Sequence, residues 1–115
     1  MTEDQEQMLF VQWWRRNRPE RIFAVPNGGH RHPAVAMKLK ATGTVAGVPD
    51  LYVPALHLWI EMKRQKGGVL SAVQKDWIEY LSSIGDTVMV GKGWEDAVAK
   101  LQELGFVPIQ NNPRC

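Results

Sequence analysis

The sequence predicts an α/β fold in which helices flank a small central sheet. Three observations lead to this fold class. Helix-type and strand-type segments follow one another in the order α-β-α-β-β-α-β-α, as in mixed domains with helices covering a sheet. The 115 residues suffice for one domain, and 44% of them are hydrophobic, enough for a packed core. We therefore expect one domain spanning residues 1–115.

The first helix is expected over residues 3–17. Thr2 can cap it, acidic residues fill its first turn, arginines lie near its end, and Pro19 stops it. Glu6 shares a face with Phe10 and Trp13 in this helix. Most of the five tryptophans are expected in the core, with Trp14 the most exposed of them.

The next segments alternate between strand, helix and loop. Residues 22–25 form a short β-prone run that is closed by a turn at 26–29. Pro33 suits the first position of a helix, which we expect to run to about Lys40. Residues 43–49 contain two glycines and a proline, and are therefore expected to be a loop.

A hairpin is expected from residues 50–53 and 58–63. Residues 71–83 give the clearest helix, since Val73, Trp77 and Leu81 recur at i, i+4 and i+8 and Ser71 has capping-box spacing to Gln74. We expect a strand at 87–90, a helix at 95–104 and a last edge strand at 106–109.

The charge is unevenly distributed along the chain. Residues 15–75 carry eleven Lys and Arg against three acids, a net +8, whereas the remainder carries −6. A basic segment raises the local concentration of polyanions such as nucleic acid. A solvated basic face is the alternative explanation when charge is taken by itself.

Composition also excludes several classes of protein. Cys115 is the only cysteine, which excludes an internal disulfide framework and a cysteine-based zinc site. The N-terminus is acidic and polar, unlike a secretory signal, and no apolar run approaches about 18 residues, the length of a membrane span. We expect a cytoplasmic protein with no membrane partner.

The residues most suited to chemistry are Asp50, Glu61 and Lys63. Glu61 and Lys63 lie two apart on the second hairpin strand, so both side chains point to one face, and Asp50 opens the first strand. Met62 points the opposite way, into the core, while its backbone carbonyl remains near the site. We expect Asp50, Glu61 and this carbonyl to bind Mg²⁺ or Mn²⁺, which prefer oxygen ligands.

Such a site suits phosphodiester hydrolysis. A metal ion lowers the pKa of bound water and neutralises charge on the phosphate, and Lys63 can orient the water or stabilise the transition state. Glu-x-Lys is also common on solvent-facing strand edges. However, the run 58–60 before Glu61 is typical of a buried strand, where charged residues require a reason.

These motifs resemble the PD-(D/E)XK nuclease superfamily, and within it the VRR-NUC (virus-type replication-repair nuclease) domain. The resemblance covers about residues 6–97. It rests on four stretches, namely Pro26-Asn27-Gly28-Gly29 with Arg31, Gly47-Val48-Pro49-Asp50-Leu51, Trp59-Ile60-Glu61-Met62-Lys63, and Leu70-Ser71-x-x-Gln74-x-x-Trp77. It implies a restriction-endonuclease-like fold with a small central mixed sheet, Mg²⁺ or Mn²⁺ dependence, and DNA as substrate.

The resemblance implies further residues and partners. Glu6 matches a first-helix glutamate of the family site, which implies a metal ligand that binds directly or through water; alternatively it only favours the helix dipole. Gln74 matches a glutamine that contacts the lysine or the substrate, although it also fits the capping box. DNA contacts are expected from Asn27, Gly28, Arg31, Lys38, Lys40, Arg64, Lys66 and Lys75. Stand-alone phage and bacterial members imply a homodimer acting on branched DNA, such as four-way (Holliday) junctions, in DNA repair.

Two other functions remain open at this point. One is a non-catalytic nucleic-acid-binding module built on the same fold. Acids inside a basic binding surface would repel phosphate, which favours the enzyme. The other is a protein-binding adaptor on an inactive nuclease fold, which the presence of all three reactive side chains disfavours.

Overall fold

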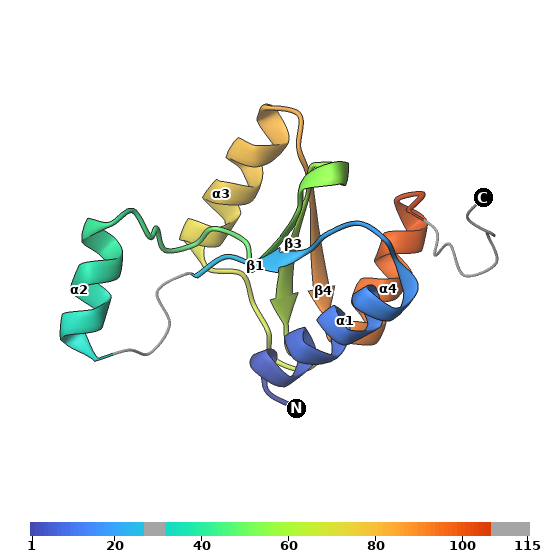
Figure 1. The fold of residues 1–115 in the computed structure, drawn as a ribbon, viewed down its shortest axis with the longest axis horizontal. Coiled ribbons are helices and arrows are strands. Elements are labelled where there is room, and N and C mark those ends of the chain that lie inside the picture. The colour runs from blue at the N-terminus through green and yellow to red at the C-terminus, as the bar shows by residue number, and fades with distance from the viewer. Residues whose placement is uncertain (27–31, 107–115) are drawn as a thin grey trace.

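The computed structural model describes residues 1–26 and 32–106, and its elements follow the expected order (Figure 1). The helices and strands are α1 (Glu3–Asn17), β1 (Phe23–Ala24), α2 (Pro33–Ala41), β2 (Leu51–Val53), the 3-10 turn η1 (Pro54–Leu56), β3 (Leu58–Lys63), α3 (Ala72–Ser83), β4 (Thr87–Lys92) and α4 (Trp94–Glu103).

The described strands form one mixed sheet in the order β1-β2-β3-β4. β1 pairs with β2 and β2 with β3 in antiparallel fashion, whereas β3 and β4 are parallel. The short turn η1 suffices to connect the antiparallel pair, while α3 supplies the longer crossover that a parallel pair needs. The predicted α/β class with a small mixed sheet is therefore confirmed.

Alternation along the strands gives the sheet two different faces. Leu51, Ile60 and Met62 point to the face covered by α1 and α4, where they join Phe10, Leu101 and other apolar residues in the core. Figure 1 shows α1 and α4 next to each other on one side of the sheet and α3 on the other. The opposite face, which carries Glu61, is the one that positions the candidate site.

The prediction that Trp14 would be exposed is wrong. The buried residues of α1 are Glu6, Phe10 and Trp14, spaced i, i+4 and i+8, so the helix turns Trp14 fully into the core. Its indole N–H donates to the Glu20 carbonyl over 2.8 Å, and the Arg18 guanidinium lies 5.0 Å from its ring centroid. The indole is therefore buried with its polar group satisfied.

α2 and α3 are less buried than α1 and α4. The predicted capping box of α3 is present between Ser71 and Gln74, but Leu81 is the one buried residue of this helix. No residue of α2 is buried, and Figure 1 shows this helix standing away from the sheet. No helix within residues 1–26 and 32–106 is long and apolar enough to cross a membrane.

Two of the predicted local features fall at the ends of the described ranges. Of the turn expected at 26–29, Pro26 is described and the remaining residues are outside the described residues. Of the edge strand expected at 106–109, Phe106 is described and is not in a strand, and the rest of that segment is also outside the described residues.

Candidate active site

Asp50 and Glu61 face each other across the end of the β2–β3 hairpin. The register pairs Leu51 with Ile60, so one further step places Asp50 opposite Glu61. Since Leu51 and Ile60 point into the core, these two carboxyl groups point to the other face. We call Asp50 and Glu61 the carboxylate pair.

The backbone of Met62 is tied to this pair. Its N–H donates to the Asp50 carboxylate over 2.8 Å. The next residue of the register, Pro49, has no N–H with which to pair the Met62 carbonyl. In a strand, the N–H and C=O of one residue point to the same side, so this carbonyl points toward Asp50. This orientation is compatible with a third oxygen ligand beside the two carboxylates, and metal binding by the Met62 carbonyl stays a prediction.

Glu61 is buried but incompletely paired. Only 1% of the surface of Glu61 is exposed to solvent. One oxygen, Oε2, accepts a hydrogen bond of 3.2 Å from the Gln74 amide and lies 3.8 Å from the Lys63 ammonium. The other oxygen, Oε1, is buried with no hydrogen-bond partner within the described part of the chain. An unpartnered buried oxygen of this kind requires an explanation, such as an absent ion.

The Glu61 carboxyl group binds its proton much more tightly than an ordinary glutamate does. Burial, reinforced by the neighbouring Asp50 carboxyl, raises the pKa of Glu61 to about 9, and the Lys63 ammonium offsets only part of that increase. Two carboxyl groups this close do not both ionise readily unless a cation joins them. Glu61 therefore holds a proton at neutral pH in the metal-free protein.

These features fit a site in which the protein gives a divalent cation only a few oxygen ligands. No group of three or more His, Cys, Asp or Glu side chains suited to a metal exists among the described residues. A site here would consist of the carboxylate pair and the Met62 carbonyl, leaving positions for water and phosphate. Hard cations such as Mg²⁺ and Mn²⁺ accept this type of incomplete oxygen coordination.

Lys63 ends β3 on the same face as Glu61. The residue is buried, and its carbonyl accepts a hydrogen bond of 2.7 Å from the Gly93 N–H. Gly68 lies so near that an added Cβ would be 2.9 Å from the Lys63 Cβ. The backbone of Lys63 is therefore tied to Gly93, and Gly68 lies close to the first atom of its side chain.

Gln74 makes the two kinds of contact considered from the sequence, and makes them together. Its side-chain oxygen accepts from the Ser71 N–H over 2.9 Å, which closes the capping box of α3. Its side-chain nitrogen donates to Glu61. Capping and contact with the site are thus compatible, since they use different ends of one amide.

Glu6 is buried where α1 meets α4. Its Oε1 accepts a hydrogen bond of 3.0 Å from the N–H of Trp94, the first residue of α4. The N-cap residue Gly93 has no side chain for this purpose, so Glu6 caps α4 across 88 positions of sequence. Metal binding by Glu6 stays a prediction. Nothing in the sequence indicated that Glu3 belongs to the site, beyond its place in the acidic first turn of α1. Its negative charge contributes slightly to the raised pKa of Glu61.

The basic residues expected to contact DNA are exposed where they are described. These are Lys38, Lys40, Arg64, Lys66 and Lys75, while Asn27, Gly28 and Arg31 lie outside the described residues. Lys75 is adjacent to Gln74, and Arg64 directly follows Lys63. Two of the basic residues are therefore sequence neighbours of the residues that contact Glu61.

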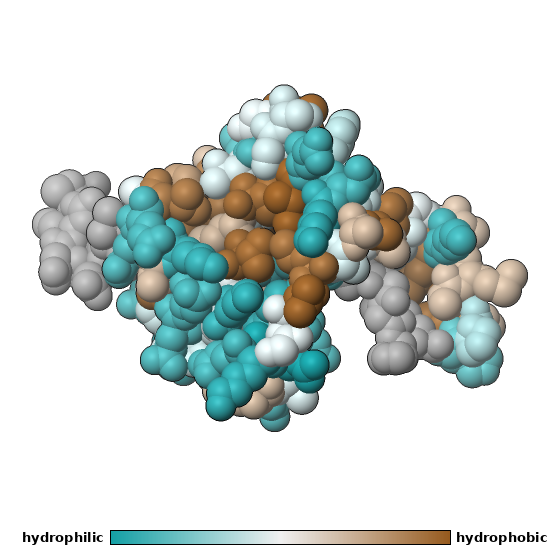
Figure 2. Space-filling view, turned by 180° about the vertical axis from the view of Figure 1, so that it is seen from behind, coloured by the Kyte–Doolittle hydropathy of each residue, from teal (hydrophilic) through white to brown (hydrophobic). Residues whose placement is uncertain are grey.

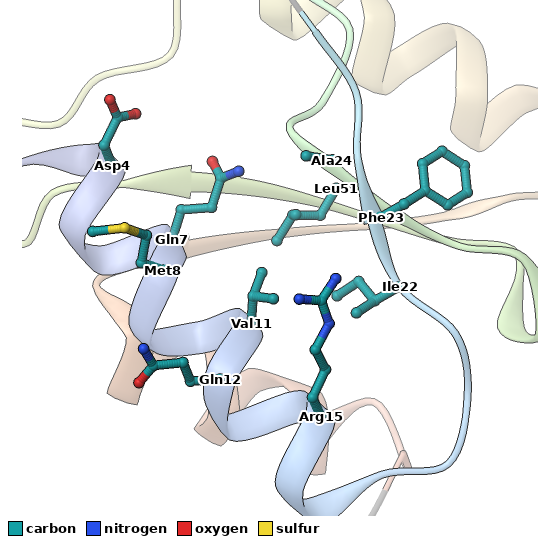
Figure 3. Close-up of a pocket in the computed structure, with 10 residues that line it drawn as sticks. All are labelled: Asp4, Gln7, Met8, Val11, Gln12, Arg15, Ile22, Phe23, Ala24 and Leu51. Atoms are coloured by element: carbon teal, nitrogen blue, oxygen red, sulfur yellow. The ribbon is translucent and has the colours of Figure 1, made fainter.

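A groove of about 530 Å³ lies between α1 and β1 (Figure 3). Leu51 and Ile22 point toward α1 in this view, whereas the ring of Phe23 points away from it. The groove therefore opens on the α1 side of the sheet, and the carboxylate pair lies on the other side. It is separate from the candidate site.

Comparison with solved structures reveals a similar protein. A structure named "VRR_NUC domain protein" superposes with a TM-score of 0.70 and 32% sequence identity, covering 90% of this chain and 87% of that one. Comparisons of the sequence with family models and with curated proteins found no match. The identity and coverage agree with the resemblance seen in the motifs, and the chain belongs to the VRR_NUC domain family.

Proposed function

We propose that this nuclease-like domain is a Mg²⁺- or Mn²⁺-dependent DNA endonuclease that hydrolyses phosphodiester bonds. The observation that carries the proposal is the unpartnered, buried oxygen of Glu61 beside Asp50. A buried polar atom without a hydrogen-bond partner is unfavourable. A divalent cation would satisfy it and relieve the repulsion within the carboxylate pair.

Each residue then has a definable part in the reaction. Asp50, Glu61 and the Met62 carbonyl would hold the cation, which supplies an acidified water and neutralises negative charge on the phosphate. The Lys63 ammonium stabilises charge that develops on the phosphate oxygens and orients the attacking water. Gln74 holds Glu61 in place through Oε2. Lys66 and Lys75 are exposed cations that attract the DNA backbone.

The substrate we propose is branched DNA, including four-way junctions, cut by a homodimer in the cytoplasm. Family resemblance and symmetry support this, since two paired cuts need two sites and one chain provides one. Hydrophobic side chains lie across the middle of the face shown in Figure 2, where they could contact a second protein. Separately, Met37 on α2 is 72% exposed. Exposed apolar patches often mark contacts between proteins.

Cleavage assays test the activity. We expect labelled junction, flap and linear DNA to be cut with Mg²⁺ or Mn²⁺ and not with EDTA, and Lys63→Ala and Glu61→Gln to lose activity. Glu79→Gln, which changes an exposed glutamate of α3, serves as the matched control and should cut normally. Equal cleavage by the wild type and Lys63→Ala would refute the mechanism.

The same assay separates the alternative function. DNA binding that needs no metal, with no cleavage by any variant, would indicate a non-catalytic binding module. The oligomeric state is measured independently as the mass in solution at micromolar concentration. A monomeric mass both with and without junction DNA would count against the dimer.

A further inference from the structure

Three aromatic side chains lie side by side across the sheet. Phe23 of β1 pairs with Tyr52 of β2, and Tyr52 pairs with Trp59 of β3. Their ring centroids are 5.9 Å apart for the first pair and 4.2 Å apart for the second. We call Phe23, Tyr52 and Trp59 the aromatic row.

The aromatic row neighbours the carboxylate pair. Tyr52 lies two residues from Asp50, and Trp59 lies two residues from Glu61, so all four side chains point to the same face. A two-residue step along a strand is about 6.7 Å. Figure 3 agrees with this placement, since the ring of Phe23 points away from α1. The row therefore runs beside the candidate site, one step along the strands.

The rings of the row are held in place and partly open to solvent. Phe23 is 49% exposed, and Tyr52 and Trp59 are partly buried. The Trp59 indole N–H donates to Asp86 over 2.8 Å, which fixes that ring at the inner end of the row. The described α3 packs against β4, at the end of the sheet away from β1. The outer ring, Phe23, lies on β1 at the opposite edge of the sheet and is half exposed.

Charge is ordered along the same face. Past the carboxylate pair, Lys63 of β3 pairs in register with Lys92 of β4. Aromatic rings, carboxylates and ammonium groups therefore follow one another in three successive rows. A nucleic-acid strand matches this order, because it offers a flat apolar base and an anionic phosphate within one nucleotide.

We propose that the aromatic row stacks an unpaired nucleobase beside the phosphate that is cut. This proposal rests on the proposed nuclease function and specifies its substrate as DNA with at least one unstacked nucleotide at the cleavage point. A base inside a duplex has neighbours on both faces, so only an unpaired or displaced base can offer a face to the row. The row thereby gives a physical reason for choosing branched over continuous DNA.

Binding in EDTA tests the row without any cleavage. The probes are a short single strand and a duplex of the same sequence, each with 2-aminopurine, whose fluorescence falls when it stacks. We expect the wild type to quench the single strand, and Phe23→Leu to bind that strand about fivefold or more weakly with reduced quenching. Affinity for the duplex should be unchanged.

Tyr80→Leu provides the matched control. Tyr80 is an aromatic residue of α3 with 54% exposure, similar to Phe23, and lies outside the row. Its substitution should change neither affinity nor quenching. Because Phe23 is half exposed, its variant is expected to fold, and circular dichroism verifies this.

Three outcomes would overturn the proposal. They are an absence of quenching by the wild type, unchanged binding by Phe23→Leu, and an equal loss of affinity for single strand and duplex. If the row does not stack a base, metal-dependent cleavage can still be observed. If the protein is not a nuclease, stacking of the base can still be observed as binding and quenching in EDTA. The two hypotheses are therefore distinguished.

Discussion

The Gln74 amide donates a 3.2 Å hydrogen bond to Glu61 while its oxygen closes the capping box of α3 with Ser71. The start of a helix and the candidate metal ligand are thus connected through one side chain. Residues that hold a metal ligand are often nearly as important as the ligand itself.

Replacing Gln74 separates capping from support of the site. Gln74→Ala removes both contacts, and we expect a loss of about 10- to 100-fold in metal affinity or cleavage. Ser71→Ala removes the cap and should cost about 1 kcal/mol of stability with little effect on cleavage. Urea unfolding and cleavage rates measure the two effects. Equal cleavage by both variants would show that Gln74 acts only as a cap.

The metal-free protein should lose stability as pH rises. The folded pKa of Glu61, about 9, exceeds the ordinary value of 4.5, so the stabilising contribution is complete below pH 4.5 and is lost between 4.5 and 9. In that range the unfolded state binds fewer protons, and stability falls by up to about 1.4 kcal/mol per pH unit. Thermal unfolding in EDTA from pH 5 to 9 measures the slope.

Glu61→Gln is expected to remove this slope and to raise the melting temperature of the metal-free protein at pH 8. Glu79→Gln should retain the slope of the wild type. Mn²⁺ should stabilise the wild type and release a proton as it binds, while stabilising Glu61→Gln far less. A slope that is the same in Glu61→Gln and the wild type would contradict the assigned pKa.

Gly47 permits the loop before Asp50 to contact α3. Its φ is +92°, and an added Cβ would overlap Val73 Cγ1 and lie 3.1 Å from the Val73 carbonyl. We expect Gly47→Ala to cost about 1–3 kcal/mol and to lower cleavage, because Asp50 and Gln74 are displaced.

Gly85→Ala is the control for backbone strain. Gly85 has a similar φ of +97° with no atom within 4 Å of an added Cβ. The difference between the two variants in urea unfolding isolates the close approach to α3. If both lose equal stability and neither loses activity, the contact between Gly47 and Val73 does not position the site.

Glu6 has two possible roles that one pair of variants distinguishes. As a cap of α4, Glu6→Gln keeps an acceptor oxygen for the Trp94 N–H and should retain most of the stability, whereas Glu6→Ala should lose about 1–2 kcal/mol. A metal-binding role predicts instead that Glu6→Gln loses Mn²⁺ affinity. Calorimetric titration with Mn²⁺ alongside thermal unfolding decides between them.

The sequence by itself determined the features that depend on near neighbours in the chain. Thr2 and Ser71 cap α1 and α3 as expected, and the predicted capping box of Ser71 with Gln74 is present, because a cap contacts residues only three positions away. Glu61 and Lys63 share a face because strand alternation has a period of two. The order of elements was predictable for the same reason.

Only the tertiary structure decided burial and cross-strand proximity. It turned Trp14 into the core, joined Glu6 to Trp94, and placed Phe23, Tyr52 and Trp59 beside the carboxylate pair. The sequence shows no aromatic residue interleaved with the basic loop, and the row arises from the register of three strands. Register and burial depend on contacts between distant residues, so local pattern does not contain them. The raised pKa of Glu61 has the same origin, since burial by the whole fold produces it.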